Sequence, residues 1–115
     1  MKESVTIKNN HEFRRMYAKG KNAVTPGVVV YCRRNRLDHN RLGVTVSTKV
    51  GKAVVRNLVR RRLREIFRLN QDKLLQGYDM IVIARVRTPS VPYRKLNGMF
   101  LRACGQLGLI KEETV

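Results

Sequence analysis

An apolar stripe and a basic stripe occupy opposite sides of one predicted helix in the middle of the chain. The apolar positions are Val55, Val59, Leu63 and Ile66. Their spacing of four, four and three residues is typical of a helix with one face packed on a core. The other side of the helical wheel, within an arc of about 140°, carries Arg56, Asn57, Arg60, Arg61, Arg64 and Arg68. The segment therefore predicts a helix over residues 53–69 with one buried and one cationic face.

Weaker amphipathic patterns predict two further helices. The first is expected over residues 9–19, where Phe13 and Tyr17 share a face because residues four apart are neighbours on a helix. The last is expected over residues 92–107, with a proline in its first turn. Two glycines inside this last helix weaken it and would permit close packing; they are Gly98 and Gly105.

Three strands are predicted from β-branched and alternating segments, over residues 28–33, 41–48 and 79–86. The unbroken apolar run at residues 80–84 indicates burial on both faces, and hence a central strand. The order helix, strand, strand, helix, strand, helix favours an α+β domain with helices packed on a small sheet.

The remaining segments are expected to connect these elements. Residues 21–27 are predicted as a loop or short extended stretch, and residues 34–40 as a polar hairpin connection. A chain of 115 residues has room for one domain, which we place over residues 1–115. Its ends, residues 1–8 and 110–115, are expected to fray.

The second predicted strand has two different faces. Leu42, Val44 and Val46 point one way, and Gly43, Thr45 and Ser47 point the other way, because side chains alternate along a strand. A small polar face beside the aromatic first helix is a candidate groove, although simple exposure to solvent would also explain it. Likewise, Phe13 and Tyr17 could be ordinary core residues or a stacking platform for unpaired bases.

The charge of the chain favours a polyanionic partner. There are 25 Lys and Arg residues against 8 Asp and Glu, a formal net charge of +17, which makes self-repulsion a standing cost. Along the predicted central helix, arginines four residues apart repel one another by a few tenths of a kcal/mol each, and phosphates would reverse that penalty. With 43% apolar residues, the chain is nevertheless expected to fold rather than remain a disordered basic tail.

Several function classes lack their sequence features. No apolar run is long enough for a membrane helix and no secretory signal is visible, so we expect a cytoplasmic protein. Cys32 and Cys104 have no metal or redox spacing and are expected to be reduced core thiols. The eight acids are scattered, with no pair suited to hold a metal ion or to act as acid and base. We therefore expect no catalytic residue and no metal site in the polypeptide.

The segment Arg41 to Glu65, RLGVTVSTKVGKAVVRNLVRRRLRE, resembles the signature of the protein subunit of bacterial ribonuclease P. The flanks agree, with Phe13 and Tyr17 in the first helix, Tyr31 ending a strand, and Asp79 before the late apolar strand. The resemblance covers roughly residues 10–107.

That resemblance implies a three- to four-stranded mixed sheet with helices in αββαβα order, including a left-handed crossover around the cationic helix. It implies a ribonucleoprotein in which a catalytic RNA with bound Mg²⁺ removes the 5′ leader of precursor tRNA. The expected partners are therefore the catalytic RNA and precursor tRNA, with no cofactor bound by the protein alone. No membrane and no protein partner are predicted.

The resemblance also assigns two sets of site residues. The RNA-binding motif falls on Lys49, Gly51, Arg56, Asn57, Arg60, Arg61 and Arg64, to which the neighbouring cations Lys52 and Arg68 are added. The leader-binding groove falls on Phe13, Tyr17, Tyr31, Thr45 and Ser47. Leu58 stands where the family has an arginine, so one basic contact is expected to be lost. Arg62, inside the apolar arc, could extend its charge to solvent.

Three alternative functions stay open on sequence alone. A small ribosomal or RNA-chaperone protein would be equally basic and would not distinguish a leader. A sequence-specific DNA-binding protein would place the arginine helix in a major groove. That helix, however, lacks the mixture of polar side chains that such a helix usually carries to contact base edges. A protein-only nuclease is the least favoured, for want of clustered carboxylates.

Overall fold

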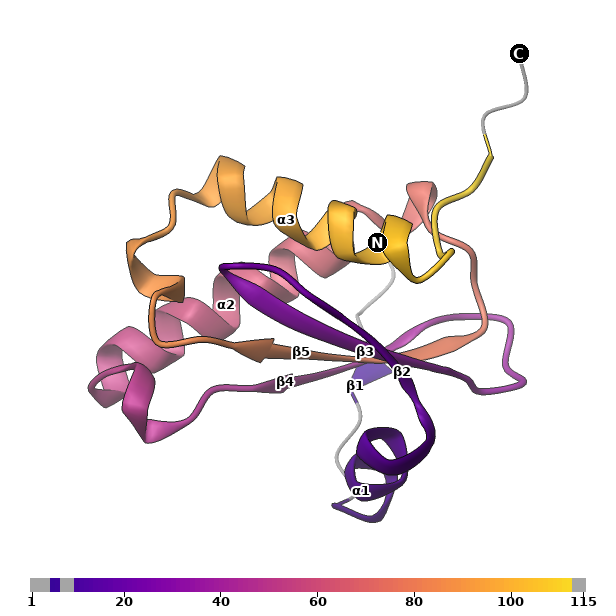
Figure 1. Ribbon diagram of the computed structural model, residues 1–115, viewed down its shortest axis with the longest axis horizontal. Coiled ribbons are helices and arrows are strands. Elements are labelled where there is room, and N and C mark those ends of the chain that lie inside the picture. Colours follow the sequence, from indigo (N-terminus) through magenta and orange to yellow (C-terminus); the bar gives the residue numbers. More distant parts are fainter. Residues whose placement is uncertain (1–4, 7–9, 113–115) are drawn as a thin grey trace.

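The computed structural model describes residues 5–6 and 10–112, which form one mixed sheet covered by helices on both faces (Figure 1). The strands are β1 (Val5–Thr6), β2 (Lys21–Val24), β3 (Val28–Arg34), β4 (Arg41–Thr45) and β5 (Tyr78–Ala84). Their spatial order is β1-β4-β5-β3-β2. The pairs β1–β4 and β4–β5 are parallel, while β5–β3 and β3–β2 are antiparallel.

Three α-helices divide unequally between the two faces of this sheet. They are α1 (Asn10–Lys19), α2 (Ala53–Leu69) and α3 (Tyr93–Gln106). Helices α2 and α3 lie together on one face and α1 lies alone on the other (Figure 1). Three short 3₁₀ turns complete the described chain, namely η1 (Thr48–Val50), η2 (Gln71–Lys73) and η3 (Thr88–Ser90).

The larger core fills the space between the sheet and the α2–α3 layer. Helix α2 buries Val59, Leu63, Ile66 and Phe67, so the predicted apolar stripe and the predicted bounds of this helix are both confirmed. Helix α3 buries Leu96, Phe100, Ala103 and Cys104. Each of these sets follows the three- and four-residue spacing by which a helix keeps one face on a core.

A smaller core lies on the other face of the sheet, under α1. Met16 and Ile81 are buried there, with Phe13, Tyr31 and Ile83 packed around them. Met80 and Val82, the neighbours of Ile81 along β5, belong to the larger core. Strand β5 is thus central and buried on both faces, as its unbroken apolar run predicted.

The sheet has two more strands than the sequence predicted. Residues 21–24, expected as a loop or short extended stretch, form β2 against β3. The Thr25 hydroxyl closes the turn between these strands, donating to the Val28 carbonyl at 2.7 Å and accepting from the Val28 N–H at 3.0 Å. Strand β1 was expected as a fraying end and instead pairs with β4 at residues 5–6. The α+β class and the mixed sheet are confirmed.

Other boundaries differ from the prediction in ways that local contacts explain. Strand β4 ends at Thr45 rather than at residue 48, because the chain turns there into η1 and buries Val50. Near the C-terminus, the Lys111 N–H donates to the Lys73 carbonyl at 2.9 Å, so backbone pairing continues into the segment 110–115 that was expected to fray. Residues 1–4, 7–9 and 113–115, the rest of the two expected frayed ends, lie outside the described residues.

The expectation that the glycines of α3 permit close packing is wrong. A Cβ built on Gly98 would have no atom within 4 Å, and one on Gly105 would only meet Ile110 Cγ1 at 3.9 Å. Both residues lie on the exposed side of the helix. They therefore weaken α3 without a packing benefit.

Strands β4 and β5 are parallel and are joined through α2. This connection is the crossover that the resemblance describes as left-handed, and its handedness stays a prediction. Helix α2 begins near the end of β4 and crosses one face of the sheet, so that only the start of the cationic helix lies at an end of the sheet (Figure 1).

Candidate nucleic-acid interface

The basic side of α2 is the first of two candidate surfaces. Asn57, Arg61 and Arg64 are exposed, and Arg56, Arg60 and Arg68 are partly exposed. The Arg60 guanidinium donates to the Asn57 side-chain oxygen at 2.9 Å. Within the described part of the chain, no carboxylate forms an ion pair with Arg56, Arg60, Arg61 or Arg64. Helix α2 therefore presents guanidinium groups whose charge the described acids leave uncompensated.

One nitrogen of the Arg56 guanidinium is buried although the residue is partly exposed. Its Nε is buried and has no hydrogen-bond partner among the described residues. An unpaired buried donor costs about 1–3 kcal/mol of stability, so the buried Arg56 Nε is locally unfavourable for the fold. The sequence wheel placed Arg56 on the basic face but could not indicate this burial.

The segment before α2 adds two lysines and a special glycine. Lys49, in η1, and Lys52, at the residue before α2, are both exposed. Gly51 between them has φ +156° and ψ −171°, a backbone region that is essentially restricted to glycine. A Cβ at this position would also lie 3.1 Å from Val55 Cγ1. Gly51 thus shapes the turn that brings the lysines to the start of α2.

The second candidate surface lies between α1 and the sheet. The Phe13 ring packs directly over Gly43 of β4, where a built Cβ would come within 2.7 Å of Phe13 Cζ. Tyr17 lies one helical turn further, with its ring centroid 6.5 Å from that of Phe13. The absence of a side chain at Gly43 lets the aromatic side of α1 sit close to the strand.

Tyr17 links α1 to two strands. Its ring meets Tyr31 of β3 edge-on at a centroid distance of 5.1 Å, an arrangement favoured by the ring quadrupoles. Its hydroxyl lies 3.4 Å from the Thr45 Oγ1 on β4. Tyr17 is nevertheless 42% exposed, and Phe13 and Tyr31 are partly exposed. The structure thus brings four of the five predicted groove residues together around partly open aromatic rings.

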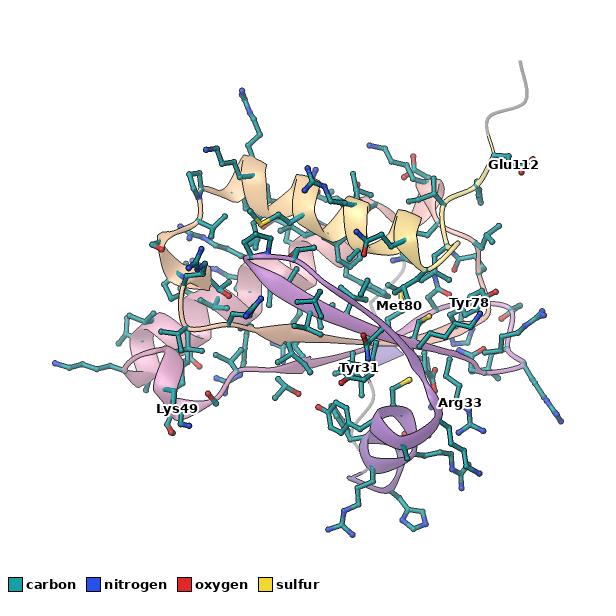
Figure 2. The ribbon with its side chains drawn as sticks, viewed as in Figure 1. Tyr31, Arg33, Lys49, Tyr78, Met80 and Glu112 are labelled. Atoms are coloured by element: carbon teal, nitrogen blue, oxygen red, sulfur yellow. The ribbon has the colours of Figure 1, made fainter. Side chains whose placement is uncertain are left out.

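The fifth predicted groove residue, Ser47, lies beyond the sheet. Strand β4 ends two residues earlier, and Ser47 is an exposed residue that leads into η1. It is therefore placed between the aromatic groove and Lys49 rather than on the sheet face. Figure 2 shows Tyr31 near the middle of the sheet and Lys49 at the end where α2 begins.

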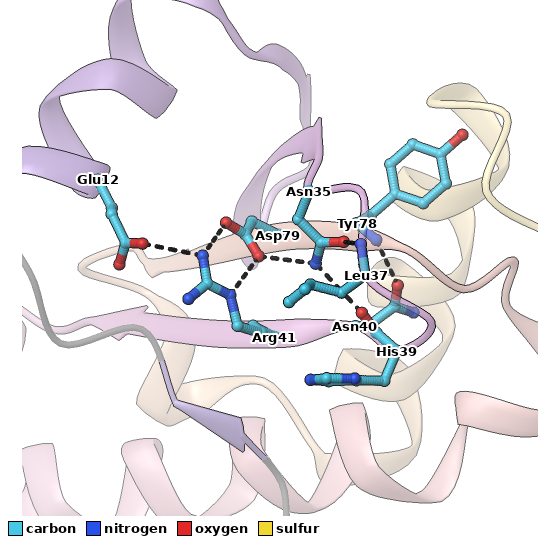
Figure 3. Close-up of polar contacts among 8 residues, drawn as sticks. All are labelled: Glu12, Asn35, Leu37, His39, Asn40, Arg41, Tyr78 and Asp79. Atoms are coloured by element: carbon cyan, nitrogen blue, oxygen red, sulfur yellow. Dashed lines mark hydrogen bonds and ion pairs between the residues drawn. The ribbon is translucent and has the colours of Figure 1, made fainter.

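A charged cluster that sequence analysis missed fixes α1 to the sheet (Figure 3). The Arg41 Nε and Nη2 donate to the two carboxylate oxygens of Asp79 at 2.7 and 2.6 Å, and Nη2 also donates to Glu12 at 2.9 Å. Asp79 further accepts from the Asn35 amide at 2.9 Å. These interactions raise the pKa of Arg41 above its ordinary value, the hydrogen bond to Asp79 contributing most. No local sequence pattern signals them, because the partners lie 29 and 38 residues away.

Comparison with known proteins gives a consistent result. A family model described as Ribonuclease P matches residues 1–108. The ribonuclease P protein component of Natranaerobius thermophilus is 38% identical over all of both chains. That of Clostridium kluyveri is 44% identical, covering 91% of this chain and 96% of its own.

Solved structures agree with the sequence relatives. The ribonuclease P protein of Staphylococcus aureus superposes with a TM-score of 0.84 at 33% identity, covering 95% of this chain and 100% of that one. The protein from Thermotoga maritima gives a TM-score of 0.78 at 31% identity, over 88% of this chain and 94% of that one. The chain belongs to the ribonuclease P protein family.

Two positions of α2 in this ribonuclease P family member bear on the extent of its basic surface. Leu58 replaces the expected arginine and is partly exposed, at the border of the buried stripe. Arg62, which the wheel places within the apolar arc, is also only partly exposed. That Leu58 removes one basic contact stays a prediction, and Arg62 is partly exposed, as are Arg56 and Arg60.

No protein-based catalytic group emerges from the described residues. Among residues 5–6 and 10–112, no three His, Cys, Asp or Glu side chains gather as metal ligands. The thiols of Cys32 and Cys104 are free and buried, and burial raises the pKa of Cys104 to about 12, which keeps it protonated and unreactive at neutral pH. No helix in the described part of the chain is both long and apolar enough to span a membrane.

Proposed function

We propose that this chain acts as the protein subunit of a ribonuclease P ribonucleoprotein and assists its RNA in removing the 5′ leader from precursor tRNA. The observation that carries the proposal is the adjacency of two surfaces. A partly open aromatic groove between α1 and the sheet leads, through Ser47 and Lys49, to the uncompensated arginines of α2. Two adjacent surfaces of this kind fit an RNA that has a single-stranded segment, for the aromatic groove, next to a folded segment, for the arginines of α2.

The α2 surface is suited to phosphates of folded RNA. Guanidinium groups form paired hydrogen bonds with phosphate oxygens, and each phosphate that is neutralised releases condensed counterions. We assign contact with the catalytic RNA, or with phosphates near the cleavage site, to the predicted motif: Lys49, Gly51, Lys52, Arg56, Asn57, Arg60, Arg61, Arg64 and Arg68. In this assignment Gly51 acts through its backbone conformation.

The groove is suited to an unpaired leader. Stacking of a base on an aromatic side chain contributes about 1–3 kcal/mol, and Phe13, Tyr17 and Tyr31 offer partly exposed rings beside the Thr45 hydroxyl. Mature tRNA has no leader and gains nothing from this groove. The protein would therefore favour substrate over product without taking part in bond cleavage.

The bond-breaking chemistry is assigned to the RNA. We propose that Mg²⁺ held by the catalytic RNA supplies it, while the protein binds no cofactor of its own. Cations on the protein offset phosphate repulsion, which lowers the Mg²⁺ concentration that a folded RNA needs. The cytoplasm, where precursor tRNA is made in bacteria, is the expected location.

The decisive experiment is cleavage of a leader-bearing tRNA by a bacterial ribonuclease P RNA at low Mg²⁺, with and without this protein. We expect cleavage to depend on the protein at low Mg²⁺ and to become less dependent at high Mg²⁺. The protein without RNA serves as the control and should leave the substrate intact. An equal rate with and without the protein at every Mg²⁺ concentration would instead favour a ribosomal or RNA-chaperone role.

A further inference from the structure

A second group of arginines lies at the end of the sheet opposite to the start of α2. They surround a pocket formed where α1, the end of β3 and the β3–β4 connection meet, and its lining includes Arg15, Arg33, Arg34, Arg36 and Arg41. Figure 2 shows Arg33 beside α1 at this end and Lys49 at the other, with Tyr31 between them. We call this group the hairpin arginine pocket. None of its residues belongs to the RNA-binding set considered so far.

The carboxylates of the pocket are already occupied. Asp79 and Glu12, which also line it, both accept hydrogen bonds from Arg41. Within the described part of the chain, no carboxylate pairs with Arg15, Arg33, Arg34 or Arg36. These four arginines have no ion pair of their own, and the arginines that line the pocket outnumber its two carboxylates, so an anion that binds between them relieves their mutual repulsion.

The connection that carries these arginines is braced. The Asn35 side chain accepts from the Leu37 N–H at 2.8 Å and donates to the His39 carbonyl at 3.1 Å and to Asp79 at 2.9 Å. Arg36, next to it, adopts a left-handed conformation with φ +62°, which is uncommon for a residue with a side chain. The backbone of the hairpin is therefore fixed before any ligand arrives, and this lowers the entropic cost of binding.

Arg34 is also pre-oriented. Its guanidinium carbon lies 5.9 Å from the ring centroid of Tyr78, within the range of a cation–π contact. Arg34 itself is exposed, so the side chain remains available to a ligand while the ring limits its motion. Guanidinium groups held in this way bind phosphate through paired hydrogen bonds.

The pocket is continuous with the aromatic groove. Met16, buried under the groove, also lines the pocket, so the two sites adjoin at this residue. On β4, Arg41 at the pocket and Thr45 at the groove are four residues apart, a distance of about 13 Å. A single strand whose cleavage-site end lies near α2 and whose bases stack in the groove would bring upstream phosphates to this pocket.

We propose that the hairpin arginine pocket binds backbone phosphates of the upstream part of the leader, so that this protein distinguishes long leaders from short ones. The proposal rests on the proposed function, since it needs a leader in the groove. The contacts are with phosphates, so the preference depends on leader length and not on leader sequence. The groove and the pocket then form two consecutive binding steps along one strand.

The test measures the affinity of the assembled ribonucleoprotein for precursor tRNAs whose leaders grow by one nucleotide at a time. The variant combines Arg15→Gln, Arg34→Gln and Arg36→Gln, three exposed positions. The matched control combines Arg94→Gln, Lys95→Gln and Arg102→Gln, which removes the same charge from exposed positions of α3 on the other face of the sheet. Circular dichroism verifies that both variants are folded.

We expect the native protein to gain affinity in two steps as the leader lengthens. The pocket variant should keep the first step and lose the second, binding long leaders roughly tenfold more weakly, the scale of one to two phosphate contacts. The α3 control should keep both steps. Changing the leader sequence at constant length should not alter the second step.

Three results would overturn the proposal. An equal loss of affinity at all leader lengths would assign these arginines to the catalytic RNA. An unchanged second step in the pocket variant would make them a solvated surface, and an equal loss in the α3 control would reduce the effect to net charge. Failure of the proposed function looks different, because the native protein would then show no preference for precursor over mature tRNA at any length.

Discussion

The Phe13 ring of α1 lies directly on the backbone of Gly43 in β4, so closely that a Cβ on Gly43 would stand 2.7 Å from Phe13 Cζ. A real side chain cannot approach a ring to this distance, and the ring would have to move. The contact therefore sets the height of α1 above the sheet, and with it the shape of the aromatic groove. Gly43 therefore shapes the groove because it has no side chain to keep Phe13 away from the strand.

Gly43→Ala should displace Phe13, destabilise the fold by about 1–3 kcal/mol, the usual cost of overpacking, and weaken precursor binding. Gly98→Ala, the same change in the open part of α3, should instead stabilise the protein by up to about 1 kcal/mol because alanine favours a helix. Denaturant titrations of both variants measure these effects. Equal stability changes in the two variants would contradict the close contact at Gly43.

Phe13→Ala should weaken binding of precursor tRNA roughly tenfold, since one stacked base contributes about 1–3 kcal/mol. Binding of mature tRNA, which has no leader, should change little. Equilibrium binding of both RNAs to the assembled ribonucleoprotein measures the difference. If both affinities fell equally, Phe13 would be a core residue and not a leader contact.

Arg60→Ala should weaken assembly with the catalytic RNA about tenfold, the equivalent of one charged hydrogen bond of roughly 1.5 kcal/mol. The loss should be the same whether or not a leader is present, because Arg60 lies on α2 and not in the groove. Arg102→Ala, at an exposed position of α3, is the control for lost charge. An unaltered assembly affinity would remove Arg60 from the interface.

Salt dependence measures how many phosphates the protein contacts in the complex. If about six are neutralised, the logarithm of the association constant should fall with the logarithm of salt concentration at a slope of about −4 to −5. Titrations between low and moderate potassium chloride at constant Mg²⁺ give this slope. A slope near zero would contradict phosphate binding by α2.

Alkaline pH should destabilise the fold through Cys104. Burial raises the pKa of its thiol from 9.0 to about 12, so above pH 9 the unfolded chain ionises while the folded chain does not. The unfolded state then binds fewer protons, and stability falls by up to about 1.4 kcal/mol per pH unit until the folded pKa is reached. Urea titrations of the native protein and of Cys104→Ala should show a shallower decline in the variant. Parallel declines would mean that Cys104 does not contribute.

Regular patterns explain why the central helix could be predicted closely from sequence. Val59, Leu63 and Ile66 repeat at helical spacing, and the observed helix buries all three. The pattern is strong because the buried and basic faces differ so much in polarity. The same reasoning found β5, whose apolar run is buried on both sides.

Long-range contacts explain what the sequence could not predict. Strand β2 is stabilised by pairing with β3 rather than by a strong strand pattern of its own, and strand propensity depends on such context. The link of Arg41 to Glu12 and Asp79 joins residues far apart in the chain. Ser47 was assigned to the sheet because the alternation continues past Thr45, whereas the buried Val50 turns the chain away.

The groove residues show a different limit of prediction from sequence. Composition alone could not decide whether Phe13 and Tyr17 are core residues or leader contacts, and the structure shows packed rings that remain at least partly exposed. Phe13 packs on the small core around Met16 and Ile81, while Tyr17 stays 42% exposed. The hairpin arginines were passed over because their sequence segment looks like an ordinary polar turn, and only the fold brings Arg15 beside them.

The two hydrophobic clusters differ greatly in size, and this difference separates the two proposed RNA-binding surfaces in stability. The basic side of α2 is attached to the large cluster, whereas α1 rests on a small one centred on Met16 and Ile81. Local opening follows the least buried layer first, so we expect α1, although the Arg41–Glu12 ion pair ties it to the sheet, to open before α2 does. Under the proposed function, the molecule would then release a leader-bearing strand while α2 keeps its contact with the catalytic RNA, which is the order of events that repeated turnover requires.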